Sequence, residues 1–208
     1  MAELSGKKGR FGSHVSRETK EPLRSYSEAI RVWTQRINLI ARKDATDEAI
    51  WQRHILDSRQ LVPLIPDGVA RVADLGSGAG LPGLVLAIER PDLHVTLIES
   101  DRRKAAFLQT MVAELHLNAT VLAERIEVVS IPPVGLVTAR ALAPLADLLG
   151  YAHPLLAGGG FCLFSKGRAA EAELTEAARQ WHMRVERFPS GTDADATIFR
   201  ISELRRAA

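Results

Sequence analysis

The stretch Val72-Ala73-Asp74-Leu75-Gly76-Ser77-Gly78-Ala79-Gly80-Leu81-Pro82-Gly83 decides how the rest of the chain is interpreted. It joins an apolar segment to a turn that holds four glycines in eight residues. Glycine suits positions that need a positive φ or a close ligand, and Pro82 suits the first turn of a helix because its φ is fixed and it lacks an N–H donor. The stretch therefore predicts a strand, a tight turn and a helix. Free N–H groups at that helix start would face the carboxyl end of the strand, so we expect a nucleotide-like ligand there.

Two classes of ligand are compatible with this turn. The spacing Gly78-x-Gly80-x-x-Gly83 matches the dinucleotide fingerprint, which would indicate NAD. Asp74, however, stands two residues before Gly76, where a dinucleotide fold usually has an apolar strand residue. With its acid, the segment 74–80 resembles the first motif of class I S-adenosylmethionine (SAM)-dependent methyltransferases, in which the acid organises the glycine loop near the methionine end of the cofactor. This favours SAM and leaves NAD as the alternative.

Length and composition predict one domain. With 208 residues and 46% apolar content, the chain can fill one α/β domain but not two. The single cysteine, Cys162, excludes an internal disulfide and fits a reducing compartment. No apolar run approaches the roughly 18 residues of a membrane span, and the first residues lack an apolar signal core. We therefore expect a soluble cytoplasmic protein that works as a monomer.

The amino-terminal part is expected to comprise a flexible arm and added helices. Residues 1–20 are rich in basic side chains, which could contact nucleic-acid phosphates or simply form a solubilising tail. In residues 21–66, apolar side chains at alternating spacings of three and four predict an amphipathic helix from Leu23, with the stripe Tyr26, Ile30, Trp33, Ile37 and Ile40. A second helical stretch, about 47–61, contains His54-Ile55-Leu56-Asp57-Ser58, where His54 and Asp57 could face a site or form a hydrogen-bonded packing pair.

The core, residues 69–204, alternates predicted strands and helices. Strands are expected near 69–75, 95–98, 118–122, 135–139, 161–164, 183–188 and 197–201, and helices near 82–90, 101–116, 147–156 and 169–181, with a turn at 158–160. This pattern fits a Rossmann-like, seven-stranded α/β sheet.

Polar residues mark the carboxyl ends of these strands. Glu99 ends the second strand about 20 residues beyond the glycines, where a carboxylate accepts hydrogen bonds from ribose hydroxyls, or where it would begin the next helix. Arg140 ends the fourth strand and Lys166 the fifth, so both are expected at the edge of the sheet that holds the glycine loop. No cluster of metal-ligating residues is apparent in the sequence.

These motifs, in this order, resemble one family: the 16S ribosomal RNA guanine-N7 methyltransferases, also called RsmG or glucose-inhibited division protein B. The resemblance covers about residues 26–201. It rests on His54-Ile55-Leu56-Asp57-Ser58, the glycine loop 76–83, Arg125-Ile126-Glu127, Arg140-Ala141-Leu142-Ala143 and Lys166-Gly167. Ser77 and Ala79 occupy variable positions of the loop, and the basic arm lies outside the shared pattern.

The resemblance implies a function: transfer of a methyl group from SAM to N7 of a guanine in the decoding region of the small ribosomal subunit. It implies a cofactor site made of Gly76, Gly78, Gly80, Leu81, Ile126, Glu127 and Arg140, supported by Asp74 and Glu99. Arg140 or Lys166 would be the catalytic residues, able to donate to guanine O6. A SAM methyltransferase acting on another substrate, and an RNA-binding assembly factor without turnover, remain alternatives.

The residues that are missing agree with N7 as the target. Pro132-Pro133 precede the fourth strand, whereas methyltransferases of exocyclic amines carry a Pro-Pro-aromatic motif after it. Cys162 is placed in mid-strand, away from where a C5 methyltransferase needs its nucleophile. Guanine N7 already has a lone pair, so the protein need only align it with the methyl group, and no general base is expected.

Overall fold

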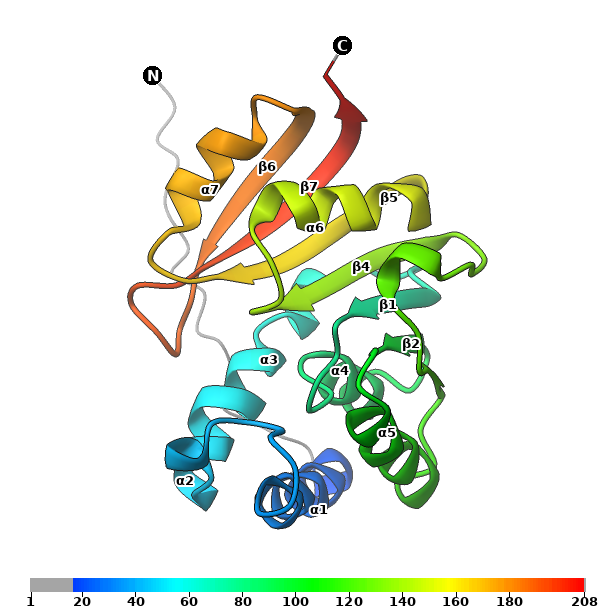
Figure 1. Ribbon diagram of the computed structural model, residues 1–208, viewed down its shortest axis with the longest axis vertical. Coiled ribbons are helices and arrows are strands. Elements are labelled where there is room, and N and C mark those ends of the chain that lie inside the picture. Colours follow the sequence, from blue (N-terminus) through cyan, green and yellow to red (C-terminus); the bar gives the residue numbers. More distant parts are fainter. Residues whose placement is uncertain (1–16, 208) are drawn as a thin grey trace.

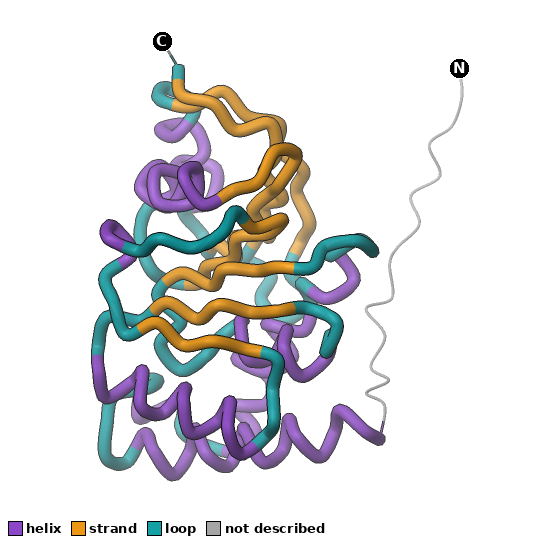
Figure 2. Tube along the Cα trace, turned by 90° about the vertical axis from the view of Figure 1, so that its right-hand side faces the viewer, coloured by secondary structure: helices purple, strands orange, loops and turns teal. Residues whose placement is uncertain are grey.

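A computed structural model describes residues 17–207, which form a seven-stranded sheet with helices on both faces (Figures 1 and 2). The strands are β1 (Arg71–Leu75), β2 (His94–Ile98), β3 (Ala119–Leu122), β4 (Val134–Arg140), β5 (Leu156–Lys166), β6 (Trp181–Pro189) and β7 (Thr197–Arg206). The helices are α1 (Arg17–Thr34), α2 (Asp47–Ile50), the π-helix η2 (Trp51–Leu56), α3 (Asp57–Arg59), α4 (Gly83–Glu89), α5 (Arg102–Glu114), α6 (Leu145–Ala152) and α7 (Ala170–Ala177). Short turns of 3-10 helix are η1 (Arg42–Asp44), η3 (Val62–Leu64), η4 (Ile126–Val128) and η5 (His153–Leu155).

The strand order is β3-β2-β1-β4-β5-β7-β6, with β7 antiparallel to its neighbours β5 and β6. The chain starts in the middle of the sheet with β1, continues to one side through β2 and β3, and then crosses to the other side of β1 with β4. The β1/β4 border is therefore the topological switch point, where ligands bind outside the carboxyl ends of the strands. The predicted seven-stranded α/β fold is confirmed.

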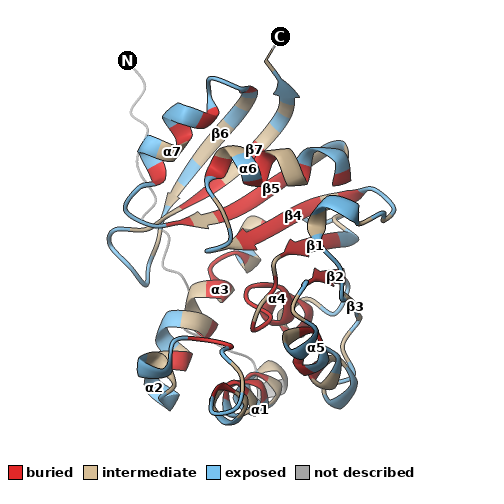
Figure 3. Ribbon diagram, in the orientation of Figure 1, coloured by how far each residue is buried: buried red, intermediate tan, exposed pale blue. Residues whose placement is uncertain are grey.

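Apolar side chains form the core on both faces of the sheet (Figure 3). Alternate residues of a strand point to opposite faces. In β1, Val72 packs with the buried residues of α1, α4 and α5, whereas Ala73 packs with those of α6 and α7. The parallel central strands β1, β2 and β4 are covered on both faces, which explains why they are mainly apolar rather than alternating with polar residues.

Three local predictions are corrected by the structure. Residues 1–16 of the expected arm lie outside the described residues, but residues 17–20 belong to α1. Helix α1 ends at Thr34, so Ile37 and Ile40 are not part of it, although both pack against the core. The apolar spacing therefore predicted correctly that Ile37 and Ile40 pack against the core, but it was wrong to place them in the same helix.

The third correction concerns the glycines at 158–160, which lie within β5 rather than in a turn before it. The pairing of β4 with β5 shifts between Val134 and Leu136, whose partners are Leu156 and Phe161. The intervening residues of β5 therefore form a bulge, and Gly159 has a φ of 78° there. The three glycines correctly indicated an irregular backbone, but the irregularity is a bulge within β5 and not a turn before the strand.

Candidate functional site

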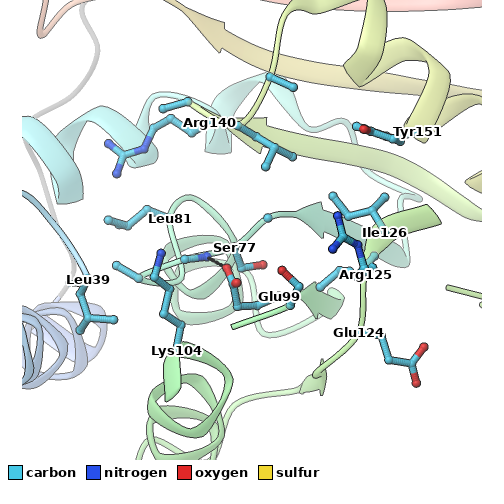
Figure 4. Close-up of a pocket in the computed structure, with 18 of the residues that line it drawn as sticks. Leu39, Ser77, Leu81, Glu99, Lys104, Glu124, Arg125, Ile126, Arg140 and Tyr151 are labelled. Carbon is cyan, nitrogen blue, oxygen red and sulfur yellow. Dashed lines mark hydrogen bonds between the residues drawn. The ribbon is translucent and has the colours of Figure 1, made fainter. Parts of the chain in front are cut away.

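A cavity of about 620 Å³ opens at the carboxyl ends of β1, β2 and β4 (Figure 4). Its wall is made by the glycine loop, the end of β2, the segment after β3 and the segment after β4. On one side, the connection after α1 adds Leu39 and Ile40, and η2 adds His54. The lining residues include Leu39, Ile40, His54, Gly76–Ala79, Leu81, Ile98–Ser100, Lys104, Glu124–Glu127, Arg140–Ala143 and Tyr151. The cavity is therefore at the switch point where the sequence predicted a ligand.

The glycine loop presents main-chain groups to this cavity. Gly78 has a φ of 57°, and a Cβ built there would meet no side chain within 4 Å, so its backbone is open to a close ligand. Gly80, with a φ of 89°, faces the interior instead: a Cβ there would lie 2.4 Å from Leu84 Cδ1. Gly80 is not part of the cavity lining, so its role is to let the loop pack on α4 rather than to contact a ligand.

Asp74 supports the loop from beneath. Its side chain is fully buried, and it accepts hydrogen bonds from Thr138 Oγ1 at 2.7 Å and from the Gly83 N–H at 3.3 Å. Burial raises the pKa of this carboxyl group to about 6, and these hydrogen bonds to the charged form oppose the rise. Asp74 does not line the cavity, so it shapes the loop from behind rather than contacting the cavity directly.

Glu99 connects the end of β2 to the loop. It is 8% exposed, lines the cavity, and accepts from the Gly78 N–H through Oε2 and from the Asp101 N–H through Oε1, both at 2.8 Å. The carboxylate therefore binds at the start of α5, as one interpretation of the sequence predicted, and it also borders the cavity. Its binding of ribose hydroxyls stays a prediction. A carboxylate has about four lone-pair directions, so two remain for ligand hydroxyls.

The opposite end of the cavity is bordered by the segment after β3. Ile126 and Glu127 belong to η4, and Figure 4 shows Ile126 near Tyr151, across the cavity from Leu39 and Leu81. Ile126 thus offers an apolar surface of the kind that a flat heterocycle packs on.

Arg140, at the end of β4, points to the amino-terminal helices (Figure 4). Its Nη1 donates to the Arg53 carbonyl oxygen at 3.1 Å and to Asp57 Oδ2 at 3.3 Å, and its Nη2 donates to His54 Nδ1 at 3.2 Å. Burial, and then the positive charge of Arg140, lower the pKa of His54 to about 4, so the imidazole is neutral at pH 7. His54 and Asp57, which the sequence suggested might pair, are brought together around Arg140.

Lys166 is at the expected edge of the sheet but does not line the cavity. Its Nζ donates to the Ala143 carbonyl oxygen at 2.8 Å and forms an ion pair with Glu173 at 2.6 Å. Glu173 also accepts from the Leu145 N–H at 2.8 Å. Lys166 therefore holds the segment that follows Arg140, and its geometry does not support a direct catalytic role.

Sequence reasoning missed several residues of the site. Tyr26, predicted only as a core residue, is buried and donates from its hydroxyl to the Ala79 carbonyl oxygen at 2.6 Å, which ties α1 to the glycine loop. A hydroxyl in an otherwise apolar stripe was the available signal, because a buried tyrosine needs a hydrogen-bond partner. Leu39 and Tyr151 also line the cavity, and no local pattern marked them. Lys104 lines it too, although its place in the basic run Arg102-Arg103-Lys104 suggests a solvent-facing charge.

The other described residues add no further type of site. Across residues 17–207, no group of three or more His, Cys, Asp or Glu side chains could hold a metal ion. In the same range, no helix combines the length and the apolar character that crossing a membrane requires.

The strand order, the glycine loop at the switch point and the acid at the end of β2 define the class I methyltransferase fold. Solved structures agree: a predicted O-methyltransferase from Agrobacterium tumefaciens has a TM-score of 0.58 at 20% identity, over 74% of this chain and 81% of that one. The N-methyltransferase NodS from Bradyrhizobium japonicum has a TM-score of 0.55 at 18% identity, over 70% of this chain and 93% of that one. At such identities the likeness concerns the fold alone.

The family follows from sequence comparison. The family model GidB, described as rRNA small subunit methyltransferase G, matches residues 19–198. A protein of Acidiphilium cryptum named ribosomal RNA small subunit methyltransferase G is 66% identical to this chain, over 99% of this chain and 100% of the relative. A protein of the same name from Granulibacter bethesdensis is 52% identical, over 94% of this chain and 90% of the relative. The chain belongs to the rRNA small subunit methyltransferase G family, as its motifs suggested.

Proposed function

We propose that the chain transfers a methyl group from SAM to N7 of a guanine in the decoding region of small-subunit 16S rRNA. The observation that carries this proposal is the cavity at the switch point, which borders the glycine loop and Glu99 on one side and Arg140 on the other. The names of the relatives support ribosomal RNA as the substrate. We further propose that the chain acts in the cytoplasm, as a monomer, on the small subunit.

The residues around the cavity fit SAM. Glu99 keeps lone pairs for ribose hydroxyls, and Ile126 offers an apolar surface for the adenine, with Glu127 beside it. Gly76, Gly78 and Leu81 line the part formed by the loop, where main-chain groups would meet the methionine end. When bound, SAM supplies an electrophilic methyl group on its sulfonium.

The substrate side of the cavity suits a nucleophile that needs no activation. Guanine N7 carries an unprotonated lone pair at neutral pH, so catalysis requires alignment rather than proton removal. Arg140 supplies positive charge and N–H donors that could bind guanine O6, a common pairing between arginine and guanine. It is the residue to which we assign substrate or cofactor contact.

The sequence predicts no general base, and the positions of His54, His153 and Cys162 support that expectation. Cys162 is fully buried, and burial raises the pKa of its thiol far above the usual value. His153 packs against Trp181 and is not among the cavity-lining residues. The Nδ1 atom of His54 accepts from Arg140, and its Nε2 atom is shielded from solvent. His54 can thus influence alignment through Arg140, but not by taking a proton from the substrate.

The test is labelled methyl transfer from SAM to small ribosomal subunits, followed by mass mapping of the modified nucleoside. We expect 7-methylguanosine at one position, and a single-turnover rate without a steep limb between about pH 6 and 9. Arg140→Ala should reduce the rate or SAM affinity strongly, whereas Arg71→Ala should not, because Arg71 binds the Pro133 carbonyl oxygen at the opposite edge of the sheet. A pH limb that disappears in one His or Cys variant would reveal a general base and refute N7 as the target.

A further inference from the structure

Arg140 is held by one short segment of the amino-terminal helices. Its three acceptors, from Arg53, His54 and Asp57, follow one another around η2 and the start of α3. Helices of the π type often occur at functional sites because they change which main-chain groups are paired within the helix. Here the carbonyl oxygen of Arg53 accepts from the Arg140 side chain. The geometry of this segment therefore sets where the guanidinium lies.

Asp57 is the charged member of this set. Its carboxylate forms an ion pair with Arg140, and both side chains are only 18% exposed. In partly buried surroundings, an ion pair contributes more to orientation than to net stability, because desolvation offsets much of the attraction. Without the carboxylate, Arg140 would keep two neutral acceptors, which define its direction less strongly.

The carboxylate is in turn held by the far end of the chain. Asp57 Oδ1 accepts from Thr192 Oγ1 at 2.8 Å and from Gln60 Nε2 at 3.1 Å. Gln60 is 5% exposed, donates to Ser190 and Thr192, and accepts from the Gly191 N–H at 2.6 Å. The loop between β6 and β7 thus reaches back to α3, as Figure 1 shows. One oxygen of Asp57 binds this loop and the other binds Arg140.

We propose that Asp57 is a positioning residue for Arg140, and that the β6–β7 loop fixes Asp57 through Thr192 and Gln60. The proposal rests on the proposed function in assigning Arg140 to the reaction. The carboxyl-terminal hairpin, which contributes no residue to the cavity lining, would then set the geometry of the site from outside it.

The test uses the full chain with Asp57→Asn, Thr192→Val and Arg140→Ala, alone and in pairs. Matched controls are Asp92→Asn, whose carboxylate pairs with Arg90 at the other edge of the sheet, and Thr175→Val, whose hydroxyl binds within α7. Single-turnover methyl transfer, KM for the subunit, the Kd for SAM and the unfolding midpoint are measured for each variant.

Asp57→Asn should lower the single-turnover rate by about 10- to 100-fold, the range expected when a positioned group is displaced, with little change in KM for the subunit. Thr192→Val should cause a smaller loss, of about 3- to 10-fold, and no additional loss in the Asp57→Asn background. In the Arg140→Ala background, Asp57→Asn should have no further effect. Both control variants should match the wild type.

Three results would overturn the proposal: a wild-type rate and SAM affinity in Asp57→Asn, a loss that persists undiminished in the Arg140→Ala background, or additive losses for Asp57→Asn and Thr192→Val. If Asp57→Asn does not fold, Thr192→Val alone must still lower the rate, and a wild-type rate there overturns the proposal. Failure of the proposed function is distinguishable, because the wild type would then transfer no methyl group to the subunit. The proposal would then be tested by the Kd for SAM: Asp57→Asn must weaken SAM binding in the wild-type background and must have no further effect on it in the Arg140→Ala background.

Discussion

Replacement of Glu99 by glutamine tests the proposed cofactor site at a carboxylate whose two oxygens both accept hydrogen bonds. The two oxygens accept from the N–H groups of Gly78 and Asp101, both at 2.8 Å. In the glutamine variant the single amide oxygen can satisfy one of these donors, and the amide NH₂ is forced to face the other. The variant therefore loses one hydrogen bond to a charged group and gains a donor–donor contact.

The expected magnitude follows from these contacts. A hydrogen bond to a charged group is worth about 1.5–3 kcal/mol, so the free energy of unfolding should fall by about that amount. For a chain of this size, the corresponding decrease in Tm is about 3–12 °C. If Glu99 also binds the ribose hydroxyls, loss of one such hydrogen bond should separately lower SAM affinity by about 10- to 150-fold.

Isothermal titration with SAM and thermal unfolding with and without SAM measure the two effects separately. Glu124→Gln is the matched control, because Glu124 also lines the cavity but its carboxylate points away from Glu99 (Figure 4). NAD should stabilise neither variant nor the wild type. An unchanged Kd for SAM in Glu99→Gln, together with a normal SAM-induced shift in Tm, would refute the ribose assignment even if the variant is less stable.

Three further predictions concern the loop, its buried acid and the amino-terminal arm. Tyr26→Phe leaves the Ala79 carbonyl oxygen without its hydrogen bond, so it should lower the free energy of unfolding by about 1–3 kcal/mol and weaken SAM binding; unchanged urea unfolding and an unchanged Kd would contradict this. The pKa of Asp74 is raised from 3.8 to about 6, so the folded state keeps a proton that the unfolded state releases, and stability is lost as the pH rises through this window. Relative to Asp74→Asn, the wild type should therefore lose up to about 3 kcal/mol between pH 4 and 7, and a pH-independent difference in urea unfolding would show that the carboxyl group titrates normally. Deleting residues 1–16 should reduce the slope of log K for RNA binding against log salt concentration by about 0.7–0.9 per lost phosphate contact, while SAM still binds. Equal slopes for the full chain and the truncated chain would show that the arm does not contact RNA phosphates.

The sequence by itself determined the sheet and the place of the site. Apolar strand segments separated by helices predicted the α/β order, and the glycines after Leu75 predicted where a ligand binds, because both features depend on local backbone chemistry. Glu99 and Arg140 were predicted at the edge of the sheet that holds the glycine loop, because the carboxyl ends of neighbouring parallel strands meet there, and both line the cavity. That they bind the cofactor stays a prediction.

Only the tertiary structure decided which way side chains at that edge point and what holds them. Gly80 and Lys166 share the edge with true cavity residues, but one faces α4 and the other an acid of α7. The bond from Thr192 to Asp57 joins positions 135 residues apart, and that from Tyr26 to Ala79 joins positions 53 apart. Local spacing carries no information about such contacts, because they form only when distant elements pack together and their polar groups must find partners in the same buried space.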